Sequence, residues 1–267
     1  MGVKNFGIER KQQILERLEV LGRIQVAELA RELNVSKETL RKDLSELEQE
    51  KLLKRTHGGA IGLQQSNDPS EIKYIYRVKQ CAREKERICK KAASLVQDGD
   101  TIFIDNSSTN LALLKYIDPA YTVTVITNSV RVLLEDNFSM SNSHTVISLG
   151  GIFRRDFFSC VGDFANEMAR KFHPNKAFLS AYGVGEDGMI CDISMYETEV
   201  KKFFMQASDR VYFTADHTKI NRSGGVILAT LDLVDYLICD RNLADAQMET
   251  LQKFDVELIV ADGQEGI

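Results

Sequence analysis

The sequence predicts a small helical domain followed by a larger α/β domain, and three observations lead to this division. Apolar residues recur at helical spacing between residues 26 and 47. From residue 101 onward, short apolar runs alternate with helical segments, as in a largely parallel sheet covered by helices. Between these patterns lies the polar stretch LQQSNDPS, with Pro69 as a breaker. We therefore expect domains at residues 1–62 and 72–267, joined by a linker at 63–71.

The small domain contains a predicted helix whose apolar face includes Val26 and Leu29 and which ends near Leu33. A short turn follows at residues 34–35. Ser36 is a good N-cap, because its hydroxyl can accept a hydrogen bond from a backbone N–H group at the start of the next helix. The sequence therefore predicts two helices joined by a tight turn.

The second helix has leucines at helical spacing, Leu40, Leu44 and Leu47, which we expect to face inward. Its polar side chains then lie on the outer face near the N-terminus, the end that enters the major groove in helix-turn-helix proteins. A strand at 52–55 and a turn at 57–59 would form a basic wing beside it. The candidate DNA-binding residues are Ser36, Lys37, Thr39, Arg41, Lys42, Lys54, Arg55 and His57.

An ordinary amphipathic helix pair with a solvated charged face has the same spacing, so periodicity alone leaves both interpretations open. The identity and order of the residues favour DNA binding, because they resemble the signature of the DeoR family of bacterial repressors. Lys51 departs from that signature, in which a glycine usually follows the recognition helix, and predicts a different C-cap in the same fold. The matching residues are Arg10, Ile14, Leu18, Ser36, Thr39, Leu40, Arg41, Lys42, Asp43, Leu44, Leu47, Leu53, Arg55, Gly58 and Gly59.

Composition limits the function classes. The 267 residues suffice for one small and one medium domain. There is no apolar run of membrane-spanning length and no signal-peptide pattern in Met1 to Ile8, so we expect a soluble cytoplasmic protein. The five cysteines show no CxxC spacing and the four histidines are scattered, which predicts reduced thiols, no metal site and no cofactor.

The net charge of −5 is unfavourable for binding DNA, but the distribution of the charges matters more. Residues 1–60 carry 12 Lys and Arg against 10 Asp and Glu, so this part is slightly basic and the remainder is acidic. DNA affinity must then come from where the cations lie, and from doubling of the domain in a homo-oligomer. We expect a dimer or a tetramer.

In the larger domain, predicted strands alternate with predicted helices. A long charged helix is expected at 72–96, where Glu84, Glu86 and many cations would face water. Buried strands are predicted at 101–105, 123–127, 145–149, 177–182, 211–215, 236–239 and 257–260. Helices are predicted between most of them, at 110–117, 130–134, 164–172, 196–208 and 243–254.

Ligands of open parallel sheets bind beyond the carboxyl ends of the strands. Several loops there carry hydroxyl, amide, glycine or cationic groups that suit a phosphorylated sugar. Each group also has a structural interpretation, since serines cap helices and glycine pairs form turns. The loop residues are Asp105, Ser107, Ser108, Thr109, Asn110, Thr127, Asn128, Ser129, Gly150, Gly151, Arg154, Arg155 and Lys219.

Together these loops resemble the C-terminal sugar-phosphate-sensing domain of the DeoR family, a fold similar to ribose-5-phosphate isomerase and CoA-transferase-like proteins. Gly162, Gly183, Gly188 and the segment 197–201 also match, so the resemblance extends from residue 10 to residue 261. It implies an effector site formed by Asp105, Ser107, Ser108, Thr109, Asn128, Gly150, Gly151, Lys201 and Lys219.

One departure from the family lies within this predicted site. Ser107 stands where the family usually has glycine, and its side chain would narrow the approach of a phosphate to the backbone. The ligand could shift, the Ser107 hydroxyl could donate where other members use backbone, or phosphate binding could be weaker.

Two classes of function fit these features. The resemblance implies a transcriptional regulator, most simply a repressor of a carbohydrate-utilisation operon, whose operator binding responds to a phosphorylated sugar. The alternative is an isomerase-like enzyme that carries a DNA-binding module, with Asp105, Glu199 and Lys201 as acid and base groups. We favour the regulator, because no carboxylate pair has a spacing that requires catalysis.

Overall fold

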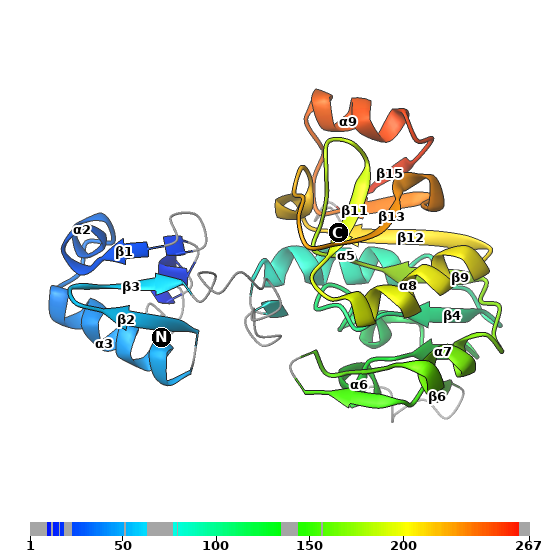
Figure 1. Cartoon of the computed structure of the whole chain (residues 1–267). Coiled ribbons are helices and arrows are strands. Elements are labelled where there is room, and N and C mark those ends of the chain that lie inside the picture. Colours follow the sequence, from blue (N-terminus) through cyan, green and yellow to red (C-terminus); the bar gives the residue numbers. More distant parts are fainter. Residues whose placement is uncertain are drawn as a thin grey trace. The chain divides into compact units, whose positions relative to one another are not determined.

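The computed structural model describes residues 10–11, 13–15, 17–18, 23–50, 52–62, 77–78, 80–134, 144–155 and 157–261. The chain forms two compact units, Met1–Gln80 and Cys81–Ile267, which we treat separately (Figure 1). The predicted linker at 63–71 and Lys51 lie outside the described residues. The predicted domain boundaries therefore stay a prediction.

The first unit has the predicted winged helix-turn-helix architecture. The described residues between 10 and 18 are helical. An antiparallel sheet in the order β1-β3-β2 flanks the helices. Its elements are β1 (Arg23–Gln25), α2 (Val26–Glu32), α3 (Lys37–Gln49), β2 (Leu53–Thr56) and β3 (Gly59–Gly62).

Local signals in the sequence explain the geometry of this unit. Asn34 adopts a left-handed conformation (φ 51°), which a short polar side chain tolerates, and it ends the turn after α2. Ser36 accepts a hydrogen bond from the N–H group of Thr39 at 3.0 Å and so caps α3, as predicted. Gly59 is required because an added Cβ would overlap the carbonyl oxygen of Ile24 on β1. Strand β1 is an addition that the sequence interpretation missed.

A single apolar core holds the first unit together. Leu40, Leu44 and Leu47 are buried in it, which confirms the predicted inner face of α3. An ion pair between Arg10 and Asp43 ties the first helix to α3, with a second hydrogen bond of 3.0 Å from the guanidinium. Two of the signature positions therefore have a structural role.

The second unit is built on a parallel sheet with the strand order β15-β14-β12-β9-β4-β5-β6. All seven strands correspond to strands predicted from apolar runs. Their bounds are β4 (Thr101–Ile104), β5 (Thr124–Thr127), β6 (Thr145–Ser148), β9 (Lys176–Leu179), β12 (Arg210–Ala215), β14 (Tyr236–Cys239) and β15 (Glu257–Val260).

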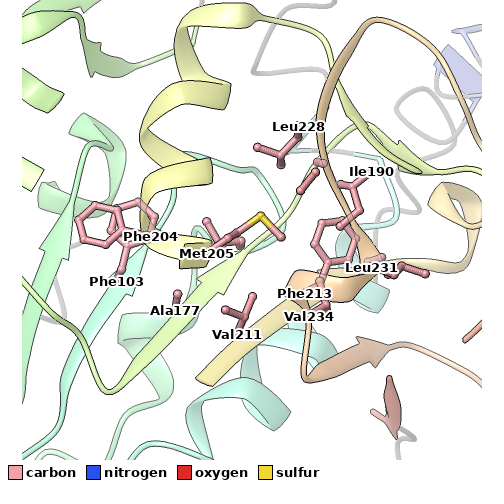
Figure 2. Packing of buried hydrophobic residues seen from close by; sticks show 14 of the residues in the cluster. Phe103, Ala177, Ile190, Phe204, Met205, Val211, Phe213, Leu228, Leu231 and Val234 are labelled. Atoms are coloured by element: carbon pink, nitrogen blue, oxygen red, sulfur yellow. The ribbon is translucent and has the colours of Figure 1, made fainter. Parts of the chain in front are cut away.

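Apolar clusters cover both faces of this sheet. Phe103 belongs to one cluster and stacks on Phe204 with ring centroids 3.9 Å apart, as Figure 2 shows. Its neighbours Ile102 and Ile104 point to the other face and pack with Ile88. A sheet buried on both faces explains why its strands are continuous apolar runs.

Helices and short 3₁₀ turns flank the sheet (Figure 1). The α-helices are α5 (Ala82–Ala93), α6 (Val130–Leu133), α7 (Asp163–Ala169), α8 (Met195–Ala207) and α9 (Asp245–Gln252). The 3₁₀ turns are η3 (Leu113–Tyr116), η5 (His217–Lys219) and η6 (Leu231–Leu233).

The structure corrects three sequence predictions. The predicted helix at 72–96 is wrong in extent: α5 begins at Ala82, because Cys81 is left-handed (φ 48°), and residues 72–76 are not described. The predicted helix at 110–117 is a turn followed by η3. The small antiparallel sheet and a hairpin were not predicted, and three of their five strands have only two or three residues. These strands are β7 (Ile152–Arg154), β8 (Ser159–Val161), β10 (Gly183–Val184), β11 (Met189–Asp192) and β13 (Val226–Thr230).

Candidate functional site

The predicted DNA-binding residues lie on α3 and on the hairpin of β2 and β3. All of them are exposed except Thr39, which is half-buried. Arg41 forms an ion pair with Glu38 at 3.1 Å on the helix surface, so its guanidinium remains accessible. This arrangement gives α3 an N-terminal half that can donate hydrogen bonds to base edges or phosphates.

The wing is attached to α3 by hydrogen bonds. The guanidinium of Arg55 donates to the hydroxyl of Ser45 at 2.7 Å, and the backbone N–H of Arg55 donates to Glu48 at 2.8 Å. Lys54 and His57 are exposed beside it. The hairpin and the helix therefore present their cations as one unit.

In the second unit, Asp105 is the centre of a buried polar cluster at the carboxyl end of β4. One carboxylate oxygen accepts hydrogen bonds from the N–H of Ser107 at 3.1 Å and the amide of Asn110 at 3.0 Å. The other accepts from the N–H of Ser180, which follows β9, at 3.0 Å. Asp105 therefore joins the loops after two neighbouring strands.

Lys201, which projects from α8, completes this cluster. Its ammonium lies 3.1 Å from Asp105 and 2.7 Å from Asp192, and it donates to the carbonyl oxygen of Ser180 at 2.7 Å. Burial would lower the pKa of Lys201, but Asp192 and Asp105 together raise it above its usual range. Lys201 is therefore charged, and it bridges Asp105, Asp192 and the backbone of Ser180.

Lys219 has a different environment, although it reaches the same strand ends. Its ammonium donates to Thr109 Oγ1 at 2.9 Å and to Ser180 Oγ at 2.8 Å. Within the described part of the chain, it forms no ion pair within 4.0 Å. Burial lowers the pKa of Lys219 to about 7; Asp216 opposes this effect, while the cations Lys85 and Lys201 add to it.

Lys85 on α5 was missed as a site residue. It was expected to face water with the other cations of that segment, but it is buried, and its ammonium donates to Ser108 Oγ at 3.2 Å. The sequence contains a signal for the burial of Lys85, because its spacing places it on the same helical face as Ile88, Cys89 and Ala92. Lys85 precedes the loop after β4 in the sequence and Lys219 follows it. The two lysines thus contact the adjacent loop residues Ser108 and Thr109.

The short turn η5 that carries Lys219 is anchored by two carboxylates. Asp216 accepts a hydrogen bond from the N–H of Thr218 at 3.1 Å. Asp240 lies 2.9 Å from the His217 ring, and its side chain is fully buried. Hydrogen bonds from His217 lower the pKa of Asp240, although its burial acts in the opposite direction.

The predicted hydroxyl residues are largely used by the fold. Ser107 accepts from the N–H of Asn110 at 3.2 Å, so its side chain folds back onto its own loop. Thr127 donates to the carbonyl of Ile104 at 2.7 Å, and Ser129 caps α6. These contacts support the structural interpretation of the three hydroxyls.

Asn128 differs from its neighbours. Its side chain is 1% exposed, yet neither atom of its amide has a hydrogen-bond partner among the described residues. The amide oxygen of Asn106, at the end of the adjacent strand β4, is also buried and unpartnered, whereas its nitrogen donates to the carbonyl of Phe157 at 3.4 Å. Asn106 lies in the predicted loop at 105–110, but it was not singled out as a site residue.

The remaining predicted residues lie on or before the β7–β8 hairpin. Gly151 is required by packing, since an added Cβ would lie 2.6 Å from the carbonyl oxygen of Val161. A Cβ at Gly150 would meet no atom within 4 Å. Arg154 donates to Ser194 at 2.5 Å and Glu197 at 2.7 Å, so it is attached to the beginning of α8. The guanidinium of Arg154 therefore contacts residues at the beginning of α8, and not Ser108 or Thr109, which Lys85 and Lys219 contact.

The described residues contain no group of three metal-ligating side chains that could hold a metal ion. They also include no helix that is long and apolar enough to cross a membrane.

The fold and these sites define a class of protein: a winged helix-turn-helix unit joined to an α/β sensor domain. Family models agree, since the DeoR-like helix-turn-helix domain matches residues 10–66 and the DeoR C terminal sensor domain matches residues 80–241. The chain belongs to the DeoR family of helix-turn-helix transcriptional regulators.

Individual relatives span almost the whole chain. The HTH-type transcriptional regulator GolR of Listeria innocua is 32% identical over 96% of this chain and 100% of its own. The lactose phosphotransferase system repressor of Lactococcus lactis is 33% identical over 92% of this chain and 95% of its own. Among solved structures, ribose 5-phosphate isomerase A of Methanocaldococcus jannaschii covers 53% of this chain and 55% of its own, with 17% identity and a TM-score of 0.39.

Proposed function

We propose that this regulator represses a carbohydrate-utilisation operon and that a phosphorylated sugar modulates its binding to the operator. The observation that carries the proposal is the approach of Lys85 and Lys219 to the adjacent hydroxyls of Ser108 and Thr109. Two ammonium groups beside two hydroxyls suit a phosphate monoester, which needs charge and hydrogen-bond donors together. The name of the lactose phosphotransferase system repressor supports sugar regulation by a relative.

The placement of the acid and base groups supports a sensor over an isomerase. Asp105 and Lys201 are 3.1 Å apart and form an ion pair, in which the carboxylate helps to raise the pKa of Lys201. Glu199 is exposed on α8 and accepts a hydrogen bond from Asn166 on α7 at 2.9 Å. Two of the three groups that the isomerase alternative requires are therefore paired with each other, and the third makes a separate contact on the surface.

The proposal includes a homo-oligomer, a dimer or a tetramer. The first 60 residues carry 12 cations against 10 anions, so a single winged unit has little net attraction for DNA. Two units on paired half-sites would add their contacts, as symmetric operators require.

The test is DNA binding by the full-length protein, measured by fluorescence anisotropy at fixed salt with DNA from upstream of its own gene. Phosphates of ribose, deoxyribose, glucose, fructose and tagatose are titrated into the complex. We expect one of them to change the DNA affinity at micromolar to millimolar concentration. Lys219→Met should bind DNA normally and respond only at much higher effector concentration. DNA binding that no phosphate alters would contradict the proposal.

A further inference from the structure

Two amide side chains at the carboxyl ends of neighbouring strands lack partners within the described residues. Asn128 directly follows β5 and is 1% exposed, and Asn106 lies just after β4 and is 3% exposed. Both amide atoms of Asn128 and the amide oxygen of Asn106 are without a hydrogen bond. Buried polar atoms in folded proteins are nearly always paired, because an unpaired atom loses its hydrogen bonds to water and gains none in the protein. These amides therefore need a partner that the described residues do not supply.

The same loops contain a matched contrast. Asn110 is fully buried in the loop after β4, like Asn106, but both of its amide atoms are used. Its nitrogen donates to Asp105 at 3.0 Å, and its oxygen accepts from Thr214 at 2.7 Å. Protein groups at these strand ends are thus able to pair a buried amide, and the described residues do not do so for Asn128.

The amides belong to loops at the same end of the sheet as the hydroxyls that the two lysines contact. Ile104 and Thr127 are directly paired in the sheet, so the residues that follow them emerge one strand apart, about 4.8 Å. The loop that begins at Asp105 carries Asn106 as well as Ser108, which Lys85 contacts. A ligand on Ser108 and Thr109 would therefore lie on the same loop as Asn106 and one strand away from the loop of Asn128.

The two parts of this candidate site, the amides of Asn106 and Asn128 and the ammonium groups of Lys85 and Lys219, differ in chemistry. An amide offers a donor and an acceptor, as a sugar hydroxyl does, whereas an amide oxygen repels a phosphate oxygen. The lysines offer positive charge and donors only. One end of this site thus suits a phosphate and the other a neutral group that both donates and accepts.

We infer that Asn128, with Asn106, binds hydroxyl groups on the carbon chain of a phosphorylated sugar whose phosphate lies against Lys85 and Lys219. The inference rests on the proposed function and adds which residues select the sugar. The backbone of the β7–β8 hairpin borders this end, because the N–H of Cys160 donates to the carbonyl of Asn128 at 2.8 Å. Asn128 is accordingly a specificity residue, and inorganic phosphate does not use it.

The test compares inorganic phosphate with the five sugar phosphates named above on full-length protein, by calorimetry. Asn128→Leu should weaken the tightest-binding sugar phosphate about tenfold and leave inorganic phosphate unchanged, because only the sugar loses a hydrogen bond. Lys219→Met should weaken both ligands alike. An unchanged ratio of the two affinities in Asn128→Leu would overturn the inference.

Thermal unfolding without ligand provides a second readout. Asn128→Leu should unfold at the same or a higher temperature than the wild type, since it removes an unpaired buried amide. Asn110→Leu, the matched control, should unfold at a clearly lower temperature. If Asn128→Leu is the less stable of the two variants, the protein itself uses that amide and the inference is wrong.

The proposed function and this inference can fail separately. Wild-type protein that binds none of the sugar phosphates would overturn both. Wild-type protein that binds one of them, with the same selectivity in Asn128→Leu, would overturn the inference alone.

Discussion

The candidate DNA surface and the strand-end cluster are built in opposite ways. The cations of the first lie exposed on one helix and one hairpin, and their few ion pairs are on the surface. The polar groups of the second are buried and come from loops far apart in sequence, as in the contact of Lys219 with Thr109. An exposed side chain can change without affecting the fold, whereas a buried charge that loses its partner destabilises it. The following predictions test this difference.

The largest effect is expected at Asp105. Asp105→Ala removes one partner of Lys201 and leaves the N–H of Ser180 and the amide of Asn110 unpaired in the interior. We expect the free energy of unfolding of the second unit to fall by about 3–5 kcal/mol, measured by urea denaturation of the full chain. A loss of less than about 1 kcal/mol would show that the strand-end cluster tolerates a substitution as well as the exposed DNA surface does.

A change on the DNA surface should weaken binding and leave the fold intact. Arg41→Ala removes an exposed guanidinium that forms a surface ion pair with Glu38. We expect operator affinity to fall by about 1–3 kcal/mol, with the free energy of unfolding changed by less than about 0.5 kcal/mol.

The control for Arg41 is Lys202→Ala, which removes one exposed positive charge from α8 in the other unit. It should affect DNA affinity far less. Effector affinity should be unaltered in Arg41→Ala, and an equal loss of DNA and effector affinity would indicate a folding defect instead.

The smallest expected effect is a change in phosphate affinity with pH, and its origin is the titration of Lys219. The pKa of Lys219 is lowered from 10.5 to about 7, so between these values the unfolded chain holds a proton that the folded chain lacks. Lys219 therefore destabilises the fold at and below about pH 7, and this penalty is relieved as the pH rises toward 10.5.

Phosphate binding should reverse that titration, because the anion favours the ammonium form. Calorimetry at about pH 8, in buffers of different ionisation enthalpy, should show proton uptake of less than one proton per site. Affinity for inorganic phosphate should decrease severalfold between about pH 7 and pH 8. Proton uptake that persists in Lys219→Met would assign the effect to another group.

Much of the fold was predictable because its signals are local. Apolar runs located all seven strands of the parallel sheet, and the cap at Ser36 located the beginning of α3. Elements without such signals were missed. Strands β7, β8 and β10 have only two or three residues each, and Cys81 has no composition cue for its left-handed conformation.

The candidate sites were predictable to different degrees. The DNA surface depends on spacing within one helix and hairpin, so the expected residues lie together. The strand-end site depends on contacts between distant loops. Spacing indicated Asp105 and Lys219, but it did not show that Lys201 is held by two carboxylates or that Lys85 is buried.

The sequence by itself determined the two-part architecture, the order of the sheet elements along the chain, and the family, because periodicity, capping and motif spacing act over a few residues. Only the tertiary structure decided which lysine is paired and which faces hydroxyls, and which buried amide lacks a partner. The physical reason is that hydrogen bonding and burial at a strand end depend on loops that the sheet, with its crossed strand order, brings together from distant parts of the chain.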